Sequence, residues 1–75
     1  MTDISRNNAA KIAIEFLKEE KNTEEIEVAE VEEKSENWIV TGTCPINLEG
    51  HKWIEKFEVI VGQSGKIKST NYALL

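Results

Sequence analysis

The sequence predicts an α+β fold in which one N-terminal helix packs on a four-stranded antiparallel sheet, in the order α-β-β-β-β. Three observations support this prediction. Apolar residues recur at helical spacing before residue 22, and four later segments alternate or are rich in β-branched and aromatic residues. The connections between these segments are short, which favours antiparallel pairing of neighbours. A chain of 75 residues has room for one hydrophobic core, so residues 1–75 are expected to form a single domain.

The helix is predicted to cover residues 5–21. Ser5 is suited to accept a hydrogen bond from a free backbone N–H of the first turn, and Ile4 before it is suited to pack on Ala9. The polar pair Asn22-Thr23 is expected to end the helix. The residues that share the apolar helix face are Ala9, Ile12, Ala13, Phe16 and Leu17.

The first strand is predicted around Ile26 and Val28, which alternate with glutamates as in a half-buried strand. Ala29 and Val31 are out of phase with this alternation by one residue. A β-bulge inserts one residue and resets which side chains face the core. We therefore expect a bulge near Val28-Ala29.

A central strand is predicted at residues 38–44, after a polar turn at residues 35–37. This strand is rich in β-branched and aromatic residues. Pro45 has no backbone N–H, so it either ends the strand or places it at a sheet edge. Residues 45–50 are expected to be a connection.

The last two strands are predicted at residues 51–61 and 66–74, joined by a glycine-containing hairpin turn at residues 62–65. Glu55 falls on the same strand face as Phe57, which is apolar. This carboxylate either is buried, with a raised pKa, or reaches water because the start of the strand overhangs the helix. A single helix covers one face of the sheet and leaves the other face bare.

The net charge of −5 argues against binding to nucleic acid or to an anionic membrane, since both need a cationic surface. Residues 15–36 carry ten Glu and three Lys, a net charge of −7, so the acidity belongs to the helix end and the first strand. Glu27, Glu30 and Glu32 have two interpretations. They guard a sheet edge against pairing with other chains, or they form a docking surface for a basic partner protein.

Residues that support catalysis or metal binding are few. The chain has one cysteine, Cys44, and one histidine, His51, whereas a structural zinc site needs about four such ligands. Catalysis by Cys44 would need His51 within hydrogen-bond reach and an oxyanion hole. The Gly-Gln-Ser-Gly-Lys string at residues 62–66 lacks the first glycine and the final Ser or Thr of a P-loop. We expect no catalytic residue, no metal and no cofactor, and therefore no enzyme.

Trp38 and Trp53 each lie at the start of a predicted strand. Aromatic residues of this size belong either to the core or to an exposed patch that binds a partner. Ile39 and Ile54 follow them and are the candidates for interaction on the bare sheet face. A symmetric dimer through that face would cover its apolar and β-branched residues, which are Ile39, Thr41, Thr43, Ile54 and Ile60.

Cysteine content and hydropathy predict a compartment. A single cysteine forms no internal disulfide, which is unusual for a small secreted domain. The N-terminal residues lack the charged and apolar regions of a signal peptide, and no apolar run approaches the roughly 20 residues that span a bilayer. We expect a cytoplasmic protein that makes no contact with membranes.

Four short patterns stand out along the chain: the Ala-rich helix from Ala9 to Phe16, Trp38-Ile39-Val40, Phe57-Glu58-Val59-Ile60-Val61 and Gly65-Lys66-Ile67. Together they resemble the small PepSY-type and gas vesicle protein O-type domains. The resemblance implies a cystatin-like fold, with a helix laid on an antiparallel sheet, and it implies no catalytic set. PepSY-like domains are associated with regulating or inhibiting proteases, and the gas vesicle protein is an accessory in assembling a protein shell.

The function expected from these observations is that of a non-catalytic protein-interaction module. Its partner is a protein that the sequence does not identify, or a second copy of the chain. One alternative is a small apolar ligand held between helix and sheet in a pocket lined by Phe16, Trp38 and Trp53. Another alternative is a domain that regulates or inhibits a protease.

Overall fold

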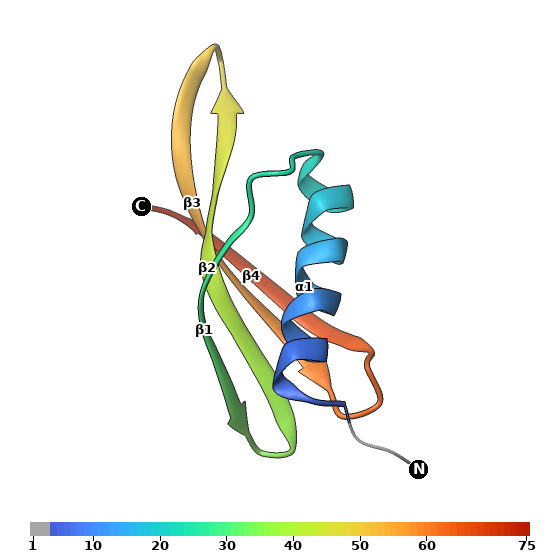
Figure 1. The fold of residues 1–75 in the computed structure, drawn as a ribbon. Helices are drawn as coiled ribbons and strands as arrows, with labels where there is room; N and C mark the ends of the chain where they lie inside the picture. Colours follow the sequence, from blue (N-terminus) through green and yellow to red (C-terminus); the bar gives the residue numbers. More distant parts are fainter. Residues whose placement is uncertain (1–3) are drawn as a thin grey trace.

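The helix and the sheet are arranged as predicted. In the computed structural model, which describes residues 4–75, the helix lies across one face of an antiparallel sheet (Figure 1). The strands follow chain order, so each pairs with its neighbour in sequence. The α+β fold class is therefore confirmed. The elements are α1 (Arg6–Lys21), β1 (Glu27–Lys34), β2 (Asn37–Leu48), β3 (His51–Gly62) and β4 (Ile67–Leu74).

Both ends of α1 have capping hydrogen bonds. The Ser5 hydroxyl accepts a hydrogen bond from the backbone N–H of Asn8 at 3.2 Å, as predicted for the N-cap. At the other end, Asn22 adopts a left-handed conformation with φ of 52°, and its N–H donates to the Lys18 carbonyl. Before the helix, the Ile4 N–H donates to the Gln63 carbonyl at 3.1 Å, which ties the start of the helix to the β3–β4 turn.

A β-bulge interrupts β1, as predicted. The register with β2 shifts just after Val28, so Ala29 is the extra residue, and its side chain is exposed. The shift places Val28 opposite Gly42 and Val31 opposite Val40. Both valines consequently lie on the helix side of the sheet.

The β2–β3 hairpin is longer than predicted. The prediction that residues 45–50 form a connection is wrong, because β2 continues through Pro45 and only Glu49 and Gly50 make the turn. These two residues have φ angles of 50° and 82°, as a two-residue hairpin turn requires. β1 pairs with β2 only as far as Thr43. Pro45 therefore lies at a sheet edge, where a missing N–H is tolerated.

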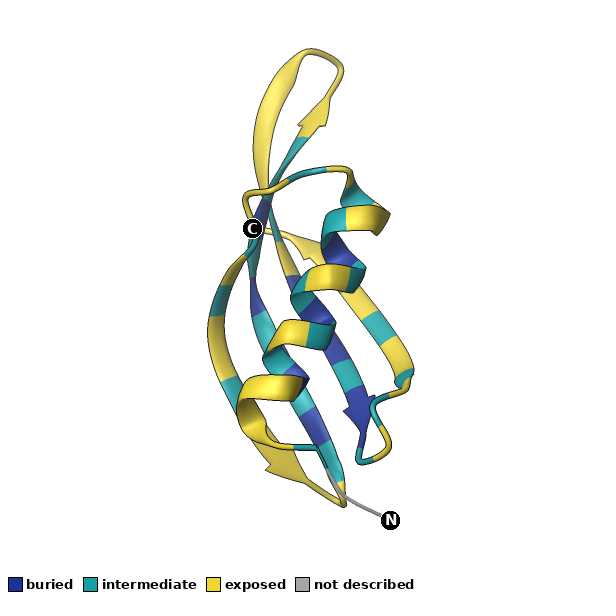
Figure 2. Ribbon diagram, turned by 45° about the vertical axis from the view of Figure 1, so that its right-hand side comes forward, coloured by how far each residue is buried: buried dark blue, intermediate teal, exposed yellow. Residues whose placement is uncertain are grey.

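The end of this hairpin projects from the rest of the molecule, and we call residues 45–54 the arm. The arm extends beyond the C-terminal end of α1 (Figure 1, Figure 2), and the molecule measures 46 by 19 by 17 Å. β1 stops pairing before the arm, and the β4 ladder reaches only as far as Glu55. Among the described residues, no strand therefore flanks the arm on either side.

The core lies between α1 and the two central strands, where Figure 2 shows the buried positions. The predicted helix face and the Phe57-containing face of β3 meet there. No polar or charged residue in the described part of the chain is fully buried. The buried residues are Ala9, Ala13, Leu17, Trp38, Val40, Cys44, Phe57, Val59 and Val61.

Candidate functional site

The face of the sheet that points away from α1, which we call the outer face, has an apolar centre and an acidic border. Ile39 of β2 lies opposite Ile60 of β3 at its centre, and both side chains are half-buried. On the other side of Ile39, β1 places Glu32 directly opposite it and Glu30 opposite Thr41. Cross-strand neighbours on one face lie about 5 Å apart, so the apolar pair and the glutamates form one continuous surface.

The outer face is polar on its β4 side. The Asn71 side-chain amide donates a hydrogen bond to Glu58 at 3.2 Å. Beside this pair lies a shallow depression of about 260 Å³, whose lining includes Thr41 and Lys56. The outer face is therefore acidic at β1, carries the Ile39–Ile60 pair and the opposite charges of Glu58 and Lys56 on the central strands, and presents uncharged polar groups at β4.

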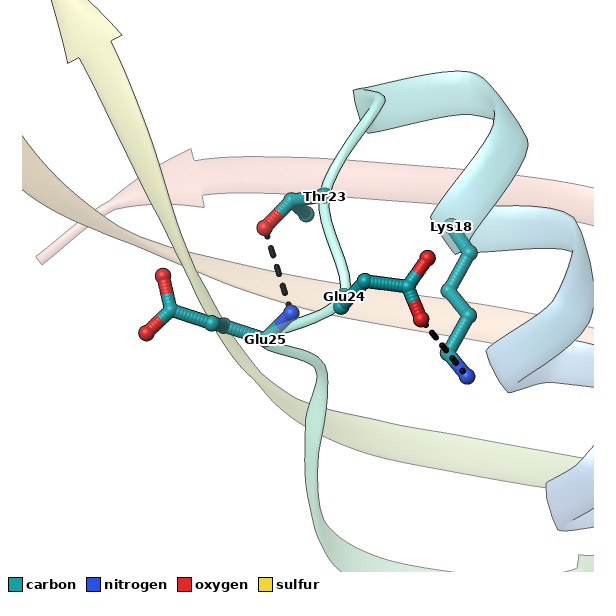
Figure 3. Close-up of polar contacts among 4 residues, drawn as sticks. All are labelled: Lys18, Thr23, Glu24 and Glu25. Atoms are coloured by element: carbon teal, nitrogen blue, oxygen red, sulfur yellow. Dashed lines mark hydrogen bonds and ion pairs between the residues drawn. The ribbon is translucent and has the colours of Figure 1, made fainter.

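The glutamates near β1 differ in how they are held. In the loop before β1, the Glu25 N–H donates to the Thr23 hydroxyl at 3.1 Å, and Lys18 Nζ lies 3.4 Å from Glu24 Oε1 (Figure 3). This ion pair contributes little to stability, because the Glu24 side chain is 87% exposed.

β1 carries four glutamates, and the three on the outer face are exposed. Among the described residues, Glu27, Glu30 and Glu32 take part in no ion pair. Their carboxylates are therefore free to meet the charges of another molecule.

The two tryptophans occupy different environments. Trp38 lies in the core, and its indole N–H donates to Gln63 at 3.2 Å, while the Gln63 amide donates to Glu33 at 2.9 Å. Trp53 lies on the arm and is 45% exposed, and its neighbour Ile54 is 47% exposed on the opposite side of the arm. Of the predicted interaction residues, Ile39 and the three glutamates share the outer face, whereas Trp53 and Ile54 belong to the arm and Trp38 to the core.

Cys44 and His51 are not brought together. Cys44 lies opposite Glu55, and His51 lies four register positions further along, opposite Leu48, which is about 13 Å away along the strands. The Cys44 side chain is buried, and burial, with the charge of Glu55, raises the pKa of its thiol. A protonated, covered thiol is a poor nucleophile. In the part of the chain that the structure describes, no three His, Cys, Asp or Glu side chains cluster as metal ligands would.

A polar cluster that the sequence did not predict lies at the end of α1. Lys21 Nζ is 2.7 Å from Glu55 Oε1 and 3.8 Å from the centre of the Tyr72 ring. The two charged side chains are only 20% and 12% exposed, so Glu55 is largely covered rather than open to water. The position of Glu55 on an apolar strand face was the one visible signal. Its partner depends on where the helix crosses the sheet.

This cluster holds the Lys21 ammonium in its charged form. Burial alone would lower the pKa of Lys21, but the hydrogen bond and charge of Glu55, with a contribution from Tyr72, raise it above its ordinary value of 10.5. A lysine of this kind does not act as a general base at neutral pH. The pair instead fastens the C-terminal turn of α1 to β3.

We expect the free energy of unfolding to fall in two stages at alkaline pH. The pKa values of Cys44 and Lys21 are raised from 9.0 and 10.5, so each group loses its proton at lower pH in the unfolded chain than in the folded protein. Each contribution is complete below the unfolded pKa and is lost as the pH rises through the folded pKa. Cys44→Ala should remove the decline that begins near pH 9.0, and Lys21→Met the decline above pH 10.5.

Urea unfolding between neutral pH and about pH 11.5 measures both stages, each variant being compared with its own stability at neutral pH. Lys18→Met is the matched control, because Lys18 pairs only with the exposed Glu24. Identical alkaline profiles for Lys21→Met and Lys18→Met would contradict the assignment of the second stage to the Lys21–Glu55 pair.

Depressions in the surface lie away from the predicted ligand pocket. One has a volume of about 440 Å³ and lies between the end of α1 and the arm, and another of about 340 Å³ lies beside β1 and Ile54. Neither these two nor the outer-face depression is lined by Phe16, Trp38 or Trp53.

The helix is too short and too polar to cross a membrane, and the described residues contain no other helix. The order of one helix and then four antiparallel strands agrees coarsely with a cystatin-like topology. Comparisons of this chain with protein-family models, with curated proteins and with solved structures gave no match.

Proposed function

We propose that the protein is a non-catalytic interaction module that binds another protein on the outer face of its sheet. The observation that carries this proposal is the arrangement of that face, in which α1 covers only the opposite side and the Ile39–Ile60 pair lies beside exposed glutamates. An apolar centre with a charged border is the usual composition of a protein interface. The two half-buried isoleucines supply the apolar surface that loses its contact with water when a partner binds.

The charge of this face defines the chemistry of the partner. Glu27, Glu30 and Glu32 attract a protein surface that carries lysine or arginine beside an apolar strip. Attraction of this kind raises the association rate and weakens as salt screens the charges over about 8 to 10 Å. Binding is therefore proposed to weaken as the salt concentration rises.

The resemblance to PepSY-type and gas vesicle protein O-type domains suggests which partners to look for first. A PepSY-like role pairs the module with a peptidase that it regulates or inhibits, and a gas-vesicle-like role pairs it with a shell protein. Both roles are non-catalytic and need a docking surface rather than a reactive site. We propose the cytoplasm as its compartment, on the single cysteine of the sequence.

Neutralising the outer-face glutamates tests the proposal. The variant Glu27→Gln/Glu30→Gln/Glu32→Gln is compared with Glu15→Gln/Glu19→Gln/Glu20→Gln, which changes the net charge equally but lies on the exposed side of α1. Proteins captured from a native extract at two salt concentrations are identified by mass spectrometry. The β1 variant is expected to lose about tenfold in affinity for a salt-sensitive partner, while the helix variant retains it.

The competing interpretation of the same glutamates gives a different result. If they only guard the edge of β1, the β1 variant binds the partner as before and aggregates more readily, because its edge is no longer charged. Unchanged binding by the β1 variant together with reduced solubility would contradict docking on this face.

A further inference from the structure

The most exposed large apolar side chains of the described chain gather at one end of the molecule. They lie on the arm and on the last residues of the chain, which run beside its base: the Leu75 N–H donates to the Ile54 carbonyl at 3.0 Å. By contrast, the isoleucines at the centre of the outer face are half-buried. The five side chains are Leu48, Trp53, Ile54, Leu74 and Leu75, with exposed fractions of 44, 45, 47, 53 and 70%.

Apolar groups lie on both faces of the arm. On the side that faces α1, Ile46 lies opposite Trp53 and Leu48 opposite His51. On the other side, Pro45 lies opposite Ile54. α1 ends before the arm begins (Figure 2), and neither β1 nor β4 pairs along it. Leu48, Trp53 and Ile54 are therefore exposed, whereas Pro45 and Ile46 at the base of the arm are half-buried.

The arm is also the uncharged part of an acidic protein. Residues 45–54 contain one glutamate and one lysine, a net charge of zero with His51 neutral, so the whole net charge of −5 lies outside the arm. Two copies that approached through β1 would bring like charges together. Two copies that approach through their arms keep the acidic strands apart, so the charge distribution favours the arm as the self-contact.

We infer that two copies of this chain associate through their arms around a two-fold axis. The two arms pack against each other, together with the C-terminal leucines beside the base of each arm. The tip of each arm enters the depression of about 440 Å³ between the partner's helix end and arm, so that both faces of each arm are covered.

The exposed apolar area is sufficient for such a contact. At roughly 200 Å² for a fully exposed large side chain, the five residues present about 500 Å² in each copy and about 1,000 Å² in two. That total reaches the size at which specific interfaces begin. Polar residues around the arm, such as Asn47 and Lys52, add to it as the rim. The outer face stays free in this dimer, so self-association and the proposed partner binding are separable.

Sedimentation equilibrium over a wide concentration range tests the inference. The wild-type protein is expected to change from 8.5 kDa to twice that mass as its concentration rises. Leu48→Lys/Ile54→Lys places charges in the contact and should leave the protein at 8.5 kDa throughout. The matched control, Ser69→Lys/Asn71→Lys, adds the same charge on exposed β4 positions and should dimerise as the wild type does. Circular dichroism shows that each variant is folded.

Tryptophan emission gives a second measurement. Trp53 moves from water into the contact, so its emission should shift to shorter wavelength with rising concentration, whereas Trp53→Phe leaves only the buried Trp38 and shows no such shift. A wild-type protein that stays monomeric at high concentration would overturn the inference. The inference would also be overturned if the Leu48→Lys/Ile54→Lys variant dimerised as well as the wild type does, or if the arm were needed only to bind a different protein.

Discussion

Replacement of Phe57 by alanine is expected to leave the protein unfolded at 25 °C. Phe57 is the largest fully buried side chain, and it lies on β3 between Gly42 of β2 and Tyr72 of β4. Truncating a buried phenylalanine costs about 3–5 kcal/mol, as lost apolar burial plus the cavity left behind. A core of this size rarely supplies more than ~3–5 kcal/mol of net stability. The substitution therefore removes most of what holds the domain together.

Far-UV circular dichroism and urea unfolding measure this effect. Phe57→Leu keeps most of the buried volume and is expected to remain folded, with a loss of about 1–2 kcal/mol. Ile54→Ala removes an apolar side chain that is 47% exposed on the arm, so it serves as the control with a small effect on the monomer. A cooperative unfolding transition for Phe57→Ala within about 1 kcal/mol of wild type would contradict the central place of Phe57 in the core.

Replacement of Gly42 by alanine is expected to have the second largest effect. A Cβ at this position would clash with the backbone carbonyl oxygen of Glu27 and would lie 2.7 Å from Phe57 Cζ and 2.9 Å from Val28 Cα. Two of these neighbours are backbone atoms of β1, which cannot move aside as a flexible side chain can. We expect a loss of about 3 kcal/mol or more, at the upper end of the cost of overpacking.

The loss from Gly42→Ala should be concentrated at β1. Hydrogen exchange measured residue by residue is expected to show faster exchange for the amides of β1 than for those of β3, because the bulged strand must separate from β2. Gly50→Ala is the matched control. Its Cβ meets nothing within 4 Å, but its φ of 82° disfavours alanine, so a loss of about 1 kcal/mol confined to the arm tip is expected. Equal losses for the two variants would contradict the steric explanation.

The pattern of residues close together in the sequence was sufficient to predict much of the fold. The helix face of Ala9, Ala13 and Leu17, the Ser5 cap and the bulge after Val28 each depend on residues close together in sequence. Helical and strand periodicities are properties of the backbone itself, so a run of side chains reveals them without knowledge of the neighbours. The connection predicted at residues 45–50 was wrong, whereas the alternative that Pro45 lies at a sheet edge was right. Local pattern could not decide between them, because the tolerance of a strand for proline depends on whether another strand lies beside it.

The candidate surfaces were predictable only in part. The bare outer face followed from the presence of a single helix, and the glutamates of β1 were visible as a charged run. The arm was not visible, since its exposure results from how far β1 and β4 extend along the central hairpin. Trp38 and Trp53 had similar sequence contexts, and only their positions relative to the end of α1 separated a core residue from an exposed one.

The sequence by itself determined the order of the elements, the sides of the two central strands that face the helix and the acidic character of β1. These features depend on residue type and on spacing of a few positions, which act before any distant contact forms. Only the tertiary structure decided which residues the helix covers and where the sheet continues beyond the end of the helix. It also decided that Lys21 Nζ lies 2.7 Å from Glu55 Oε1. Those outcomes depend on the lengths and crossing of elements that are far apart in the chain. Packing of the whole core sets them, and no local pattern encodes them.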